Sequence, residues 1–238
     1  MAISLRGNAS ATGLDGADIT VTLPGGIAQD DVVYGAYCMD GVSNQNMAMI
    51  TAGYTELADL FAADSFAANL GVFRKRQGAT PDSTAVFDGI IAEEASAAVE
   101  VLIGVDTTTA EDATTTTATG SDGPTPDPPS ITTVTNNAWV IAIGGSTEAD
   151  VPTAPTNYIN LIEDQLSPSN IMMATREIAS FGAENPGTFG GIAGNVQDSW
   201  CAATVAVRPA TGGAAGDGLE WASLPPRPPR LPAFIAAY

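Results

Sequence analysis

Two stretches decide the fold expected for this chain: residues 69–83, NLGVFRKRQGATPDS, and residues 170–188, NIMMATREIASFGAENPGT. Each begins as an apolar run, passes into polar residues and ends in a turn that contains Gly and Pro. Further landmarks keep a separation of 102 to 105 residues: Tyr54 and Tyr158, Gly78 and Gly182, Pro81 and Pro186, Val105 and Val207. Residues 19–22 and 31–37 are echoed in the same order by residues 131–134 and 137–143. The sequence therefore predicts two divergent copies of one repeat of four to five strands.

Short apolar segments bounded by Gly, Pro, Asp or Asn follow one another along both copies. Such spacing, without a long helical pattern, is typical of an all-β sandwich. We expect strands at residues 18–23, 31–39, 69–76, 84–90, 96–106, 138–145, 157–164, 171–180 and 199–209. A short helix is an alternative within residues 55–70. Two repeats packed face to face predict a jelly-roll-like β-sandwich.

The expected boundaries place an N-terminal segment at 1–16 and one sandwich domain at 17–210, with halves 17–106 and 130–210. Residues 107–129 are rich in Thr and then in Pro, and they predict a surface connection between the halves. Residues 211–238 begin with a Gly-rich stretch and continue as a proline-rich arm.

Composition excludes several classes of function. The chain of 238 residues has 27 acidic and 8 basic residues and a net charge of −19, which disfavours binding to nucleic acid or to anionic membranes. It has no histidine, so His-based triads and His-ligated zinc are excluded. Cys38 and Cys201 lie in apolar runs and are expected to fill the core, with a disulfide as the alternative. No signal peptide or membrane span is apparent, which predicts synthesis in a cytoplasm.

Acidic clusters are the first candidate sites. Their Asp-Gly-rich context favours solvated turns over calcium loops, and we expect no metal and no cofactor. The clusters contain Asp15, Asp18, Asp30, Asp31, Asp122, Asp127, Glu163 and Asp164. Glu93 and Glu94 are adjacent, so in a strand they would face opposite ways and could not act on one glycosidic bond. We therefore expect no catalytic residues.

Three consecutive cations, Arg74, Lys75 and Arg76, stand out in a chain poor in them. They predict either pairing with neighbouring acids or a contact patch for an acidic partner. Trp139 and Trp200 begin corresponding segments of the two halves and are expected at the core or rim of the sandwich. A sugar-stacking platform is the alternative role for these tryptophans.

The arm unites prolines, two arginines and large apolar side chains. Proline imposes an extended polyproline II path, which loses little entropy on docking. We expect a docking arm, with folding back onto its own sandwich as the alternative. Its expected contact residues are Trp221, Leu224, Arg227, Arg230, Leu231, Phe234, Ile235 and Tyr238.

The order of motifs also resembles a known family. The motifs are ITVTLPGGIAQDDVVYGAY (19–37), GYTEL (53–57), GVFRKRQGATPDS (71–83), VLIGVD (101–106), SITTVTNNAWVIAI (130–143) and WCAATVAVRPA (200–210). Together they resemble a β-sandwich domain of structural proteins of tailed bacteriophages, found in tail, fibre-like and capsid-decoration components. The resemblance covers about residues 18–210 and carries over no active-site residue, because its motifs are structural.

The resemblance implies a non-enzymatic virion subunit, located in capsid decoration or in a tail or baseplate fibre. Its implied partners are capsid or tail proteins and copies of itself, with host surface glycans as a further candidate. A carbohydrate-binding or host-adhesion module is the alternative function.

Overall fold

The structure is a computed structural model that describes residues 2–211, except residues 42, 65, 91–92, 122, 124, 149 and 195–197. The described residues form strands and no helix, which confirms the all-β prediction. It follows that they contain no helix able to cross a membrane.

Seven strands make up the first half of the chain. They are β1 (Ser4–Gly13), β2 (Ile19–Thr22), β3 (Val32–Asp40), β4 (Thr55–Ala62), β5 (Ala68–Arg76), β6 (Thr84–Phe87) and β7 (Ala95–Ile103). Their antiparallel pairs are nested: β1 with β7, β2 with β6 and β3 with β5, while β4 pairs with β5. Because β7 also pairs with β3, the large sheet has the order β1-β7-β3-β5-β4. Nested pairing of this kind is what makes the half jelly-roll-like.

The second half repeats this plan with β8 (Thr116–Gly120), β9 (Ile131–Thr132), β10 (Ala138–Ser146), β11 (Ile159–Leu166), β12 (Ser169–Ile178), β13 (Ala183–Glu184) and β14 (Trp200–Val207). Here β8 pairs with β14, β9 with β13 and β10 with β12. The large sheet has the order β8-β14-β10-β12-β11, which is the order of the first sheet, strand for strand. The jelly-roll-like order therefore exists within each half, and each half has seven strands instead of the four to five expected.

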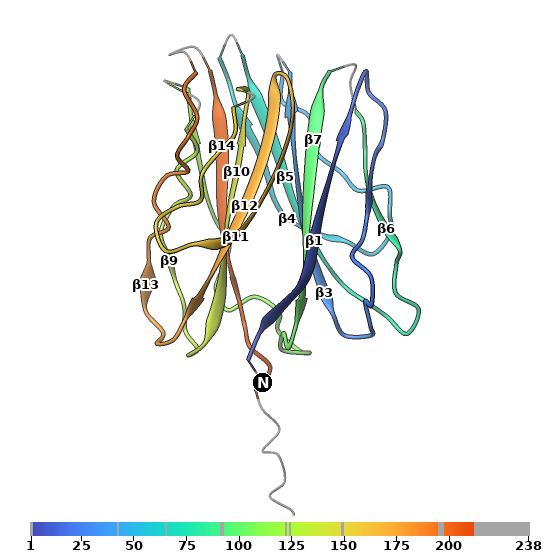
Figure 1. Ribbon diagram of the computed structural model, residues 1–238, viewed down its shortest axis with the longest axis vertical. Helices are drawn as coiled ribbons and strands as arrows, with labels where there is room; N and C mark the ends of the chain where they lie inside the picture. Colours follow the sequence, from blue (N-terminus) through green and yellow to red (C-terminus); the bar gives the residue numbers. More distant parts are fainter. Residues whose placement is uncertain are drawn as a thin grey trace, which may run out of the picture.

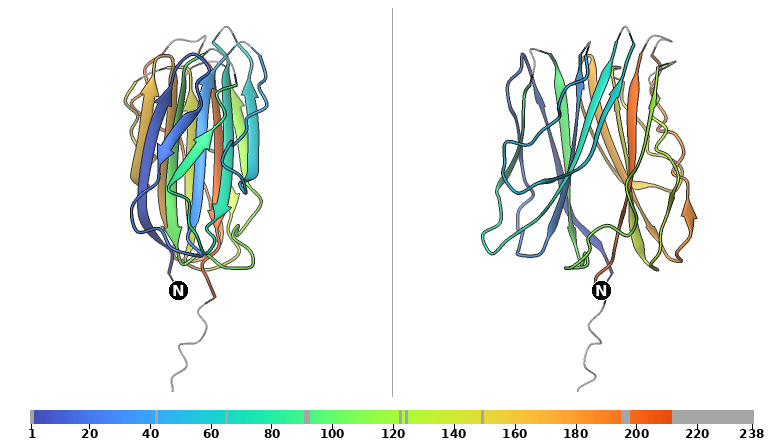
Figure 2. Two further views of the ribbon diagram at one scale, coloured as in Figure 1. Left: turned by 90° about the vertical axis from the view of Figure 1, so that its right-hand side faces the viewer. Right: turned by 180° about the vertical axis from the view of Figure 1, so that it is seen from behind.

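The two large sheets pack face to face. Figure 1 shows the sheet of β1, β7 and β3 on the right, the sheet of β10, β12 and β14 on the left, and the small pairs outermost, with β6 on one side and β9 and β13 on the other. The central core combines fully buried side chains from both sheets, among them Tyr34, Leu70, Ile141, Ile143 and Val205. Seen from the side in Figure 2, the strands run close to the long axis of the molecule. Burial of both faces explains why β3, β10 and β14 are continuous apolar runs.

Each large sheet has a second core on its outer face. Between the large sheet and the small pair of β2 and β6 lie the rings of Tyr37 from β3, Phe73 from β5 and Phe87 from β6, with centroids 5.1 to 6.5 Å apart. Under β9 and β13 lie Tyr158, Met172 and Phe189. The molecule thus has four layers.

Two expected boundaries were wrong. The N-terminal segment is not separate from the sandwich, because β1 (Ser4–Gly13) is an edge strand paired with β7. The connection at 107–129 is not only a loop, because Thr116–Gly120 pairs with β14 as β8. Both were missed because polar strands at a sheet edge need few apolar residues.

The alternative of a helix within 55–70 is also wrong. Thr55–Ala62 is strand β4, and its pairing with β5 shifts by one residue between Glu56 and Ala58. This β-bulge interrupts the two-residue alternation, so Leu57, Leu60 and Phe61 acquire a spacing that is typical of a helix.

Candidate functional site

A cluster of charged side chains lies where the first half of the chain passes into the second. Arg74 at the end of β5 places its Nε 2.8 Å from Glu111 Oε1. The same carboxylate accepts a hydrogen bond from the Tyr34 hydroxyl at 3.3 Å. Burial raises the pKa of Tyr34 well above its usual value, with a further contribution from Glu111, so this phenol stays a donor. Glu111 is therefore held in place by one cation and one neutral donor.

Asp112 fixes the next residue of this connection. Its side chain is buried and accepts hydrogen bonds from the backbone N–H of Val134 and of Thr135, at 2.6 and 3.0 Å, and from the Thr135 hydroxyl at 2.8 Å. Arg208 Nε lies 3.3 Å from the same carboxylate. The connecting segment is thus tied to both halves by adjacent acids.

The other two cations of the predicted patch also have partners within the chain. Lys75 Nζ lies 2.6 Å from Asp82 Oδ2 and donates to the Ala52 carbonyl at 2.8 Å. Arg76 donates to the carbonyls of Asp30, at 3.0 Å, and of Asp106. Arg74, Lys75 and Arg76 are therefore paired within the chain, which is one of the two roles predicted for them. A contact with a neighbouring molecule stays a prediction.

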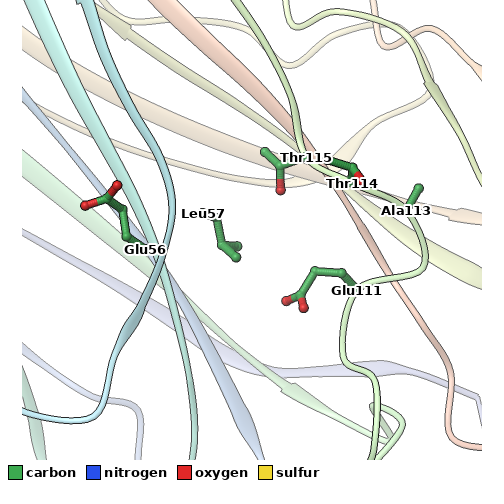
Figure 3. Close-up of a pocket in the computed structure, with 6 residues that line it drawn as sticks. All are labelled: Glu56, Leu57, Glu111, Ala113, Thr114 and Thr115. Carbon is green, nitrogen blue, oxygen red and sulfur yellow. The ribbon is translucent and has the colours of Figure 1, made fainter.

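A hollow of about 450 Å³ opens beside Glu111, between β4 and the segment leading to β8. Figure 3 shows Leu57 and Glu111 pointing toward each other across it, with Thr114 and Thr115 on the far side, while Glu56 points away from them. Glu111 is already paired with Arg74 and hydrogen-bonded by Tyr34, so it is not a free acid or base. The other groups that face the opening are the apolar side chain of Leu57 and the hydroxyls of Thr114 and Thr115. The hollow is suited to binding.

Two smaller hollows continue along β4. One, of about 230 Å³, shares Glu56 with the first and is lined by Met47, Met49, Tyr54 and Phe73 among others. The next, of about 200 Å³, shares Asn46 and reaches Asp59. Sequence analysis missed this surface, although Tyr54 was a landmark of the repeat, because the segment 44–54 and β4 meet only in the folded sheet.

The predicted acidic clusters form turns and pairs in the part of the chain that the structure describes. Asp31 pairs with Arg6 at 2.6 Å and accepts the N–H of Ala28 at 2.7 Å. Asp18 accepts the N–H of Gly89 at 3.2 Å, and Asp15 and Asp30 have positive φ angles of 54° and 70°. Glu163 and Asp164 lie in strand β11, so the expected turn is wrong for these two acids. Asp122 lies outside the described residues. Among the residues that the structure does describe, no group of three or more Cys, Asp or Glu side chains is placed to hold a metal ion.

Glu93 and Glu94 precede β7 and lie near Asp40 at the end of β3. Burial raises the pKa of Asp40, and the charges of both glutamates raise it further. The backbone carbonyl of Glu94 accepts the N–H of Asp40 at 3.2 Å. These acids mark a strand end.

The two tryptophans have structural surroundings. Trp139 is 7% exposed and belongs to the central core. Trp200, at the start of β14, packs directly over Gly120 of β8, where even a single added Cβ would lie 2.4 Å from the indole ring. These contacts agree with the expected positions of the two tryptophans at the core and the rim of the sandwich. Because Trp139 is buried, it cannot stack against a sugar.

Both cysteines are free and buried, so the disulfide alternative is wrong for this structure. The Cys38 thiol donates to the Ser146 carbonyl at 3.7 Å, and the Cys201 thiol donates to the Ala68 carbonyl at 3.4 Å. Each thiol therefore contacts the opposite sheet. Burial raises the pKa of Cys38 to about 12.

Glu100 of β7 is a residue that sequence analysis did not single out. It is fully buried, and neither carboxyl oxygen has a hydrogen-bond partner. Burial raises its pKa to about 8. The only signal in the sequence was a single acid within the apolar run of residues 96–105.

All eight predicted docking residues of the arm, from Trp221 to Tyr238, lie outside the described residues. The described chain ends at Thr211, which with Ala2, Asn136 and Pro209 lines a hollow of about 330 Å³. Both ends of the described chain therefore lie at the same end of the sandwich, as Figure 1 shows for the start of β1 and the exit from β14.

Comparison with known proteins identified no relative of this chain. No family model matches it, no curated protein matches it, and no solved structure matches it.

Proposed function

We propose that the protein is a non-enzymatic structural subunit of a tailed-phage virion, held to the particle by its C-terminal arm. The observation that carries the proposal is the shared position of Ala2 and Thr211 at one end of a four-layer sandwich. An arm leaving that end would anchor the subunit there and present the loops of the opposite end to the outside.

The charge distribution supports an arm with a separate role. The six cations of residues 2–211 all have acidic or carbonyl partners within the chain. The remaining two, Arg227 and Arg230, belong to the arm, whereas 25 of the 27 acids precede it. An acidic body with a neutral, apolar arm suits attachment of many copies without self-association of the bodies.

Deletion of residues 211–238 tests the proposal. We expect the truncated chain to keep the unfolding cooperativity of the full chain but to be lost from particles assembled in its presence. Incorporation of the truncated chain at full occupancy would contradict the proposal. Immunogold labelling of intact particles then separates capsid decoration, with label over the head, from a tail or baseplate role, with label at the tail.

A carbohydrate-binding module stays the second candidate function. With Trp139 buried, Trp200, which is partly exposed, is the tryptophan among the described residues that is open to sugar stacking. Quenching of tryptophan fluorescence by glycans, abolished in Trp200→Ala, would favour this function over the virion subunit.

A further inference from the structure

The three adjoining hollows beside β4 form one groove, which we call the β4 groove. It is defined by Asn46, Met47, Tyr54, Glu56, Leu57 and Asp59. Met47 is buried and Tyr54 packs against the same outer core, so the floor is apolar and aromatic. Glu56 and Asp59 are exposed along the rim. The groove thus combines an apolar floor with an acidic rim.

The β-bulge in β4 sets the spacing of the two acids. Glu56 pairs with Phe73 and Asp59 pairs with Gly71, two residues apart on β5. Partners two residues apart lie on the same face of a sheet, about 7 Å from each other. Without the bulge, residues three apart would face opposite sides, so the bulge is what brings both acids to one rim.

The arm carries the complementary chemistry. Pro226, Pro229 and Pro232 recur every three residues, and so do Arg227 and Arg230. In a polyproline II helix, which has three residues per turn and a rise of about 3.1 Å, these prolines would share one edge and these arginines another, with successive members of each set about 9 Å apart. Proline-rich segments of this kind dock into aromatic-lined grooves. Flexible arginine side chains about 9 Å apart can meet carboxylates about 7 Å apart.

The length of the intervening chain decides which copy supplies the arm. Fourteen residue steps separate Thr211 from Pro225, and they span up to about 46 Å when extended. The longest strands have ten residues, which corresponds to about 33 Å. The chain is therefore long enough for the arm to reach any side of its own sandwich, and a short tether corresponds to an effective concentration of about millimolar.

We propose that residues 225–232 occupy the β4 groove of the same chain, with Arg227 and Arg230 facing Glu56 and Asp59 and the proline edge against the Tyr54 side. This goes beyond the proposed function, since it concerns the free subunit before any attachment. It stands or falls independently of whether the arm is needed for incorporation.

Paramagnetic relaxation in the full chain tests the proposal. A nitroxide is attached at Ser223→Cys; the native thiols of Cys38 and Cys201 are buried and stay unlabelled. We expect line broadening of the amides of Asn46, Gly53, Glu56 and Asp59, relative to the reduced nitroxide. The broadening should persist when the labelled chain is diluted into an excess of unlabelled, spin-free chain, because both partners are on one molecule.

Charge reversal provides the specificity test. Glu56→Lys with Asp59→Lys should lower the docked fraction by about fivefold for each pair lost. Adding Arg227→Glu with Arg230→Glu should restore it. Glu177→Lys, which changes an exposed acid on β12, is the matched control and should leave the broadening unchanged.

Three results would overturn the proposal. The first is the absence of line broadening anywhere in residues 2–211. The second is broadening confined to another surface, such as that of the exposed Val134 and Phe181. The third is broadening that disappears on dilution, which would assign the groove to the arm of a second copy. Full incorporation of a chain lacking residues 211–238, together with groove docking in the full chain, would instead contradict the proposed function alone.

Discussion

The two halves have the same strand order but cover their outer faces differently. In the first half, β2 and β6 have four residues each, and Phe87 of β6 packs against the rings of Tyr37 and Phe73 of the large sheet. In the second half, β9 and β13 have two residues each, and Phe189 enters the core from a loop. The same strand order is therefore compatible with an outer layer of paired strands or with one made mostly of loops, provided that apolar side chains cover the outer face of the large sheet.

Truncation of one buried phenylalanine in each half should give the largest losses in the free energy of unfolding. Phe87→Ala should lower the free energy of unfolding by about 3–5 kcal/mol for the lost burial, and by about 1 kcal/mol more for the lost ring contacts. Phe189→Ala, equally buried but without a ring neighbour of this kind among the described contacts, should lose only the first amount. Urea denaturation of both variants measures the difference; equal losses would show that the aromatic cluster adds nothing.

The buried acids that tie down the connections should rank next. Asp112→Ala removes the partner of Arg208 and of three hydrogen-bond donors, and should cost about 3–5 kcal/mol. Asp31→Ala in the first half removes the partner of Arg6 and of the Ala28 N–H, and should cost about 2–3 kcal/mol. Thermal unfolding at matched pH gives the order, and a larger loss for Asp31→Ala would contradict it.

Glu100 should make the stability depend on pH. The inward residues of β14, which include Cys201, Ala203 and Val205, are apolar, whereas β7 carries Glu100 between Ala98 and Leu102.

Burial raises the pKa of Glu100 from 4.5 to about 8, so the folded chain retains a proton that the unfolded chain has released. The penalty is absent below pH 4.5, grows as the pH rises to about 8 and is then complete. Glu100→Gln should remove this slope and raise the free energy of unfolding at pH 7 by on the order of 3 kcal/mol. Urea titrations between pH 5 and pH 9 measure the slope of both chains, and an unchanged slope in the variant would assign it to other groups.

The smallest effect concerns the thiols. Cys38 and Cys201 belong to different halves, and each contacts the opposite sheet. Because both are buried and burial raises the pKa of Cys38 to about 12, a thiol reagent at neutral pH should react only after the halves separate. Reaction kinetics in increasing urea should follow global unfolding for both thiols. Faster labelling of one would show that its half opens first.

The sequence alone determined the fold class, because short apolar runs between turn residues have few stable solutions other than a β-sandwich. It also determined the positions of most central strands, whose two buried faces require continuous apolar residues. The docking role of the arm rests on the sequence alone, because proline restricts φ without help from tertiary contacts, and it stays a prediction.

Only the tertiary structure decided the rest. The edge strands β1 and β8 are polar and short of apolar residues, so their pairing depends on the neighbour that each finds in the sheet. The bulge in β4, the burial of Glu100 and the β4 groove arise where residues distant in sequence meet. A side chain's partners and its exposure to water are properties of that meeting, and local sequence does not encode them.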